Sequence, residues 1–153
     1  MILKEGQLAP KFKADDANGE TVSLSDFRGS KVVLYFYPKD DTPGCTKEAC
    51  SFRDVFQKLK RAGIKVIGVS PDSPRSHGKF TSKYQLPFIL ISDPDHSVAD
   101  AYGSYGEKKF MGRTYQGFLR NTFLIDETGR IKKIFEKVKP EDHALEVLTA
   151  FKD

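Results

Sequence analysis

Residues 31–45 read KVVLYFYPKDDTPGC, an apolar and aromatic run that ends at Pro38 and leads to Cys45. An unbroken run of β-branched and aromatic residues is typical of a strand buried on both faces in the middle of a sheet, and proline stops such a strand. We therefore predict a central strand over residues 31–37, followed by a turn that leads to Cys45.

An amphipathic helix is predicted directly after this turn, from Cys45 to Arg61. Four apolar residues recur at helical spacing, namely Phe52, Val55, Phe56 and Leu59. Gly63 follows and is expected to end the helix. A thiol at the start of a helix meets unpaired backbone N–H groups and the positive end of the helix dipole, and both favour the reactive thiolate. Cys45 is therefore the candidate nucleophile, and Cys50 is the only other cysteine.

The next elements indicate parallel strand pairing. We predict a strand over residues 65–70, a helix that begins at Ser73-Pro74 and carries Phe80 and Tyr84, a strand over residues 88–91 and a short helix over residues 95–102. Strand, helix and strand in succession imply parallel pairing with a right-handed crossover.

The second half of the chain has weaker patterns. Between Gly103 and Gly117 we expect a loop or an irregular hairpin, and a β-hairpin follows over residues 122–135. A last helix is expected near Pro140, with its buried side formed by Leu145, Leu148 and Phe151. This order predicts an α/β fold of the thioredoxin-like type, a central mixed sheet flanked by helices, with residues 1–153 forming a single domain.

Composition excludes several classes of protein. The chain has 153 residues, of which 39% are hydrophobic, and its net charge of +4 is scattered, so we expect no nucleic-acid partner. No segment approaches the roughly 20 apolar residues of a membrane span, and the first residues do not resemble a signal peptide. We therefore expect a cytoplasmic protein without a membrane partner. In a reducing compartment, a close cysteine pair is catalytic or metal-binding more often than structural.

Residues 36–50, FYPKDDTPGCTKEAC, resemble the signature of the peroxiredoxin family: a proline, a threonine four residues later and the reactive cysteine three residues after that. The similarity is greatest to the branch of the bacterioferritin comigratory proteins, also called peroxiredoxin Q. The segments LSDFRG, SDPDH and RNTFLID, which begin at residues 24, 92 and 120, agree as well, so the similarity runs nearly end to end.

This resemblance implies a thiol-dependent peroxidase that requires no cofactor and no metal. Cys45 would attack a hydroperoxide and become a sulfenic acid, and Cys50 would resolve it as an intramolecular disulfide. Arg120 would favour the thiolate and polarise the peroxide, Thr42 would place its hydroxyl against the sulfur or the peroxide oxygens, and Pro38 would shield the pocket from water.

Glu48 has two possible interpretations, since it would either orient Arg120 or act only as a partner of the helix dipole. The apolar side chains of Phe110, Met111 and Tyr115 are also open to two interpretations. They would either line the substrate pocket or cover the core.

The spacing of the two cysteines makes a geometric demand. Residues five apart on a regular α-helix have Cα atoms roughly 8.5 Å from each other, whereas a disulfide needs at most about 6.8 Å. We therefore predict that the first turns of this helix unwind in every catalytic cycle, so that the reduced form is helical and the oxidised form is locally unfolded.

The electron donor implied by the resemblance is thioredoxin or a glutaredoxin-like dithiol protein, and resolution within one chain favours a monomer. A thiol-disulfide oxidoreductase would carry Cys-x-x-Cys, but here four residues separate the cysteines. A zinc site would need two ligands beyond these cysteines, and the three histidines are scattered. A redox sensor or holdase stays an alternative, distinguished by reacting with peroxide once instead of turning over.

Overall fold

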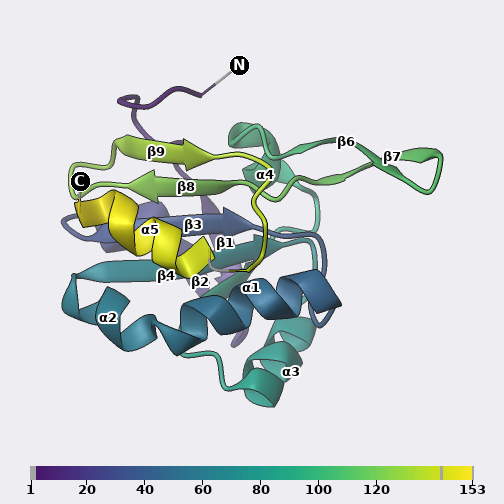
Figure 1. The fold of residues 1–153 in the computed structure, drawn as a ribbon, viewed down its shortest axis with the longest axis horizontal. Helices are drawn as coiled ribbons and strands as arrows, with labels where there is room; N and C mark the ends of the chain where they lie inside the picture. Colours follow the sequence, from purple (N-terminus) through teal and green to yellow (C-terminus); the bar gives the residue numbers. More distant parts are fainter. Residues whose placement is uncertain (1–2, 142, 153) are drawn as a thin grey trace.

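The computed structural model describes residues 3–141 and 143–152, which form two β-sheets and the helices around them (Figure 1). The strands are β1 (Lys13–Asp16), β2 (Thr21–Ser23), β3 (Lys31–Phe36), β4 (Ile64–Ser70), β5 (Ile89–Ser92), β6 (Tyr105–Phe110), β7 (Arg113–Phe118), β8 (Thr122–Ile125) and β9 (Ile131–Phe135). The helices are the 3₁₀ helix η1 (Leu24–Phe27) and α1 (Pro43–Asp54), α2 (Phe56–Arg61), α3 (Pro74–Tyr84), α4 (Ser97–Ala101) and α5 (His143–Lys152). Within residues 3–141 and 143–152, no helix is long and apolar enough to cross a membrane.

The main sheet has seven strands in the order β2-β1-β5-β4-β3-β8-β9. Strand β3 lies near its centre, parallel to β4 and antiparallel to β8, and β4 is parallel to β5. The predicted parallel pairing, the mixed sheet and the hairpin of β8 and β9 are therefore confirmed. The predicted central strand is also confirmed, although β3 ends at Phe36.

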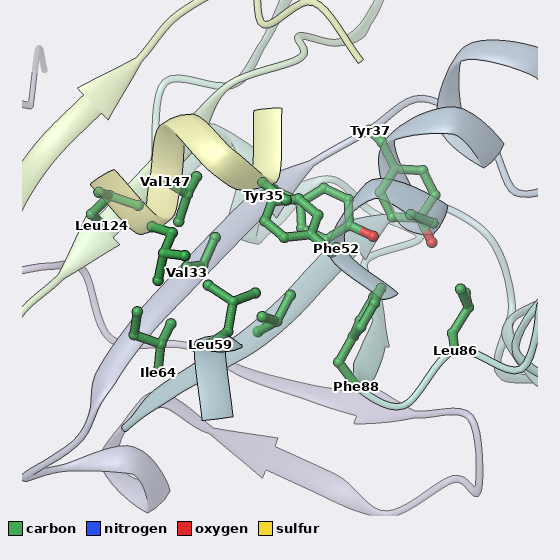
Figure 2. Packing of buried hydrophobic residues seen from close by; sticks show 14 of the residues in the cluster. Val33, Tyr35, Tyr37, Phe52, Leu59, Ile64, Leu86, Phe88, Leu124 and Val147 are labelled. Atoms are coloured by element: carbon green, nitrogen blue, oxygen red, sulfur yellow. The ribbon is translucent and has the colours of Figure 1, made fainter. Parts of the chain in front are cut away.

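Strand β3 supplies side chains to both hydrophobic clusters, as a strand buried on both faces must. Val33 and Tyr35 face the cluster that also holds residues of α1, α2 and α5, whereas Val32 and Leu34 face the cluster that includes α4. On the first face the ring of Tyr35 stacks on that of Phe52, with centroids 4.9 Å apart (Figure 2). This packing holds α1 against the carboxyl-terminal half of β3.

The single helix predicted over residues 45–61 is wrong, because the structure divides it into α1 and α2. Val55 lies between them with φ −106° and ψ 11°, outside the helical conformation. Apolar residues keep their helical spacing across this break, so the pattern contains no sign of it. The Ser73 cap is confirmed, since the Ser73 side chain accepts a hydrogen bond from the backbone N–H of Ser76.

The segment between Gly103 and Gly117 is a regular hairpin of β6 and β7, not the loop or irregular hairpin expected. Its register runs from Tyr105 opposite Phe118 to Phe110 opposite Arg113. Met111 and Gly112 form the turn with φ 51° and 78°, the left-handed pair that suits a two-residue hairpin turn. Most of the hairpin is exposed and it projects from the body (Figure 1), so it lacks the apolar alternation of a half-buried sheet.

One further expectation, on the last helix, needs correction. Leu145 was expected on the buried side of the last helix, but it is 47% exposed, whereas Leu148 and Phe151 are buried as expected. Helix α5 is described from His143, three residues after Pro140, and the residue directly before it lies outside the described residues. The short strands β1 and β2 have too few apolar residues for their sequences to predict them.

Candidate active site

The turn between β3 and α1 brings Cys45 to the carboxyl end of the central strand. Thr42 has the extended backbone of a helix cap, and Pro43 opens α1 with its φ already fixed for a helix. Cys45 therefore lies in the first helical turn, where it is only 1% exposed. The first intrahelical hydrogen bond runs from the N–H of Thr46 to the carbonyl of Thr42. The N–H groups of Gly44 and Cys45 come before it and lack an intrahelical partner.

Arg120 contacts the sulfur of Cys45 although 75 positions separate the two residues. Its Nη2 donates to Cys45 Sγ at 3.3 Å. Arg120 lies two residues before β8, the antiparallel neighbour of β3, and its carbonyl accepts a hydrogen bond of 2.7 Å from the N–H of Val138. The N–H of Phe36 likewise donates to the carbonyl of Asn121 at 2.9 Å. Sheet pairing thus fixes the backbone that carries this cation beside the thiol.

Glu48 holds the other side of the Arg120 guanidinium, since Nη1 donates to Glu48 Oε1 at 2.9 Å. The structure thus provides the contact needed by the first interpretation of Glu48. Burial raises the pKa of Glu48 to about 7, even though the charge of Arg120 and its hydrogen bond act to lower it. Burial acts to lower the pKa of Arg120. The negative charges of Cys45 and Glu48 outweigh this effect and raise the pKa of Arg120 above its usual value.

Gly44 is a site residue whose packing role sequence reasoning missed. A Cβ atom built on Gly44 would lie 3.1 Å from Arg120 Nη2, closer than side chains usually approach. The absence of a side chain at this position therefore allows the guanidinium to reach Cys45. No local pattern could have shown this, because the contact joins segments far apart in the sequence.

Two further predicted site residues, Thr42 and Pro38, flank the same turn. The Thr42 hydroxyl donates a hydrogen bond of 2.9 Å to the carbonyl of Lys39. Its oxygen keeps lone pairs that can accept a hydrogen bond from another group. Within the described residues its hydrogen bond goes to this carbonyl and not to Cys45. Pro38 is half-buried and lines a groove next to the turn.

This groove has a volume of about 330 Å³ and lies between the turn and the β6–β7 hairpin. Proline and aromatic side chains form most of it, and its lining includes Pro38, Pro71, Pro94, His96, Tyr105, Tyr115 and Phe118. The roles of three apolar hairpin residues had two interpretations, lining the pocket or covering the core. Tyr115 lines the groove, whereas Phe110 and Met111 are 66% and 86% exposed near the hairpin tip. Lys108 also lines it, with Nζ donating to the carbonyl of Phe118 at 2.9 Å.

The charge of Lys108 interacts with the site. Burial and the charge of Arg120 lower the pKa of Lys108, whereas the charge of Cys45 raises it. The pKa of Lys108 is lowered overall, so a cation of reduced basicity lines the groove, and the sequence contained no signal for it, because the hairpin around it lacks a pattern.

Cys50 lies further along α1 in a different environment. It is half-buried and borders an open groove of about 510 Å³, together with Leu145 of α5. An ion pair of 3.2 Å between Lys47 and Glu141 lies beside this groove and joins α1 to the segment before α5. Both cysteines are free in this structure, and both belong to the same continuous helix.

Comparison with known proteins agrees with this arrangement. Residues 6–134 match the model of the AhpC/TSA family. The chain is 49% identical to the peroxiredoxin Bcp of Bacillus subtilis, over 100% of this chain and 98% of that protein. The Escherichia coli peroxiredoxin Bcp is 48% identical, over 99% of this chain and 97% of that protein.

Solved structures give the same result. The Cys-to-Ser mutant of PrxQ from Xylella fastidiosa has a TM-score of 0.92 at 34% identity, with 99% of this chain and 96% of that chain covered. The bacterioferritin comigratory protein of Xanthomonas campestris, studied for its alkyl peroxide reduction activity, has a TM-score of 0.90 at 35% identity, with 97% and 98% covered. These likenesses confirm the predicted thioredoxin-like fold.

Proposed function

The chain belongs to the AhpC/TSA family and is a peroxidase of the peroxiredoxin type, and we propose that it reduces hydroperoxides at Cys45 and resolves the product with Cys50. The contact between Arg120 and Cys45 carries this proposal. A permanent cation 3.3 Å from the sulfur favours the thiolate, which is the nucleophilic form of cysteine.

In the proposed first step, the Cys45 thiolate attacks the terminal oxygen of the hydroperoxide. A sulfur–oxygen bond forms as the oxygen–oxygen bond breaks, and water or an alcohol leaves after taking up one proton. The sulfur is thereby oxidised by two electrons to a sulfenic acid. The N–H groups of Gly44 and Cys45 support this step, because first-turn N–H groups have no intrahelical partner and can stabilise charge on the leaving oxygen.

Thr42 and Pro38 have supporting roles in the same step. The Thr42 hydroxyl is oriented by its hydrogen bond to the Lys39 carbonyl, and its oxygen can accept a hydrogen bond from the O–H of an incoming hydroperoxide. Pro38 lines the groove beside the turn, and in this proposal its apolar ring limits the access of water to Cys45.

In the second step the thiolate of Cys50 attacks the sulfur of the Cys45 sulfenic acid. A sulfur–sulfur bond forms as the sulfur–oxygen bond breaks, and the hydroxide that leaves takes up a proton from the solvent to become water. The intact helix α1 contains both residues, and regular helical geometry holds their Cα atoms roughly 8.5 Å apart. A disulfide requires at most about 6.8 Å. The first turns of α1 must therefore unwind before the bond forms.

The proposed substrates are hydrogen peroxide and organic hydroperoxides. The groove beside Pro38 has an apolar and aromatic lining. Such a lining binds the organic group of an alkyl hydroperoxide more favourably than it binds water. The activity described for the related Xanthomonas campestris protein, alkyl peroxide reduction, supports the same range here.

The proposed electron donor is thioredoxin or a glutaredoxin-like dithiol protein, since the family reduces its disulfide with a dithiol partner. The exposed groove at Cys50 is compatible with access by such a partner. A monomer, a single domain over residues 1–153 and a cytoplasmic location stay predictions of the same proposal.

The test is peroxide consumption coupled to thioredoxin, thioredoxin reductase and NADPH, for the native protein and for Cys45→Ser and Cys50→Ser. We expect Cys45→Ser to lose all reaction with peroxide. Cys50→Ser should form a sulfenic acid, detected by dimedone trapping and mass, yet lose turnover with thioredoxin.

Each part of the proposal has its own contrary result. Peroxide consumption by Cys45→Ser would overturn the assignment of the nucleophile. Full turnover of Cys50→Ser would leave a one-cysteine mechanism and remove the argument for unwinding. If the native protein consumes one equivalent of peroxide and stops with reductant present, the sensor or holdase alternative is correct.

A further inference from the structure

The turn that carries Pro38 and Thr42 is tied to α3 by two buried side chains, Asp40 and His77. Asp40 lies midway between Pro38 and Thr42 and is 7% exposed, and His77 is fully buried. Nδ1 of His77 lies 2.7 Å from Asp40 Oδ2. The proposed chemistry uses the residues on either side of Asp40 but gives this pair no part.

The hydrogen bonds around the pair define its charge. Asp40 Oδ2 also accepts a hydrogen bond of 2.7 Å from Ser76 Oγ, and Asp40 Oδ1 accepts one of 2.6 Å from Tyr37 Oη. Burial raises the pKa of Tyr37 well above its usual value, so the phenol keeps its proton and donates it. Two hydroxyl donors favour the ionised form of this carboxyl group, because that form only accepts hydrogen bonds.

The other nitrogen of His77 requires a second proton on the ring. Nε2 lies 2.9 Å from the carbonyl oxygen of Ile91, which can only accept. Nδ1 faces the Asp40 carboxylate, which also accepts. With Asp40 ionised, both nitrogens have a partner only when both carry protons, so the ring is then an imidazolium paired with a carboxylate.

The backbone of the turn is anchored independently of α1. The N–H of Asp40 donates to Asp72 Oδ2 at 2.7 Å, and the same oxygen accepts from Ser70 Oγ at 2.7 Å. The partners of Asp40 thus come from the end of β3, from α3, and from the segment that joins β4 to α3. None of these partners belongs to the helix that must unwind.

We propose that the Asp40–His77 ion pair is a positioning element, which holds Pro38 and Thr42 in place for peroxide attack and keeps them there while α1 unwinds. This inference rests on the proposed roles of Cys45 and Cys50. Removal of one partner would leave the other charge buried and alone, which is strongly destabilising. The informative variant therefore removes both charges together.

The test compares the double variant Asp40→Asn/His77→Gln with Asp41→Asn, a matched control in the same turn. Asp41 is exposed, its ion pair with Lys83 lies at the surface, and asparagine readily adopts its φ of 57°. Two rates are measured at Cys45 in a single turnover, namely oxidation by hydrogen peroxide and alkylation by iodoacetamide. Iodoacetamide needs an accessible thiolate but not the peroxide geometry.

We expect the double variant to oxidise roughly tenfold to a hundredfold more slowly, the range for a small misplacement of reacting groups, with alkylation unchanged. Asp41→Asn should keep both native rates. In the native protein, nitrogen NMR of the imidazole at neutral pH should show both His77 ring nitrogens protonated.

A native rate of oxidation in the folded double variant would overturn the positioning role. Slow oxidation together with faster alkylation would also overturn it, because this pattern indicates a loosened fold around a buried thiol. A singly protonated His77 ring would overturn the ion pair, even if the double variant did not fold. None of these results changes the outcome for Cys45→Ser, so the nucleophile is tested separately.

Discussion

The two cysteines of α1 lie in opposite surroundings on the same helix. Cys45 is almost fully buried, belongs to the hydrophobic core and contacts the Arg120 guanidinium. Cys50 is half-buried and borders an open groove between α1 and α5. The first position combines low solvent access with a fixed charge, and the second offers access to a partner.

This difference indicates that one conformation cannot serve both cysteines. A nucleophile benefits from a dry site in which charged groups are held in advance, because electrostatic stabilisation is stronger there. A resolving thiol must instead travel to its partner. The molecule separates the two demands, since the turn before Cys45 is anchored to α3 by Asp40 while α1 carries both sulfurs.

The largest expected effect concerns the helix itself. On oxidation to the Cys45–Cys50 disulfide, amide exchange over residues 46–50 should become roughly a thousandfold faster, because the helical hydrogen bonds in this part of α1 are lost, while β3 keeps its protection. Hydrogen exchange with mass spectrometry measures this change, and Cys50→Ser treated with the same peroxide is the control. An oxidised protein that keeps α1 protected, with the disulfide shown by peptide mass, would contradict the unwinding.

The next effect tests the charged surroundings of Cys45. Arg120→Gln should slow sulfenic acid formation by about a hundredfold, as for the loss of one preorganised donor. Alkylation at neutral pH should slow as well, because less of the sulfur is thiolate. Stopped-flow kinetics would measure the oxidation, with Arg113→Gln, an exposed arginine of β7, as the control. Equal rates in the two variants would remove the basis for the role of Arg120.

Glu48 provides a pH-dependent test of the same surroundings. Its pKa is raised from 4.5 to about 7 by burial, so the folded protein holds this proton more tightly than the unfolded chain. The free energy of unfolding should therefore fall as pH rises from 4.5 to about 7. We expect this decrease to be roughly 3 kcal/mol in the native protein and absent in Glu48→Gln.

Urea unfolding at several pH values measures this difference. The control is Glu107→Gln, which removes an exposed carboxyl group of β6 and should leave the native pH dependence in place. If Glu48→Gln loses stability over this range as the native protein does, the buried Glu48 carboxyl group is not its source.

The smallest expected effect concerns the surface near Cys50. The Lys47–Glu141 ion pair is exposed, with side chains 61% and 72% accessible, so it stabilises α1 only slightly. Glu141→Gln should speed disulfide formation by about twofold, because α1 unwinds a little more readily. Quenched samples of the sulfenic acid and the disulfide measure this rate, and slower resolution would contradict the expectation.

The elements that were predicted correctly have strong local patterns. The continuous apolar run of β3 and the Gly129 turn between β8 and β9 each lie within a short stretch, so sequence spacing is sufficient. The β6–β7 hairpin is mostly exposed, and the break at Val55 interrupts no apolar period. Patterns that rest on burial could not reveal either feature.

The sequence by itself determined the parallel strand–helix–strand order from β3 to β5, the β8–β9 hairpin, the position of Cys45 at the start of a helix and its five-residue spacing from Cys50. These properties are local, because strand periodicity, helix caps and helical rise depend on neighbouring residues. Only the tertiary structure decided that Arg120 lies between Cys45 and Glu48, that Gly44 leaves room for it and that His77 holds Asp40. The register of β3 with β8 and the packing of α3 set these contacts, and both depend on burial across the whole sheet.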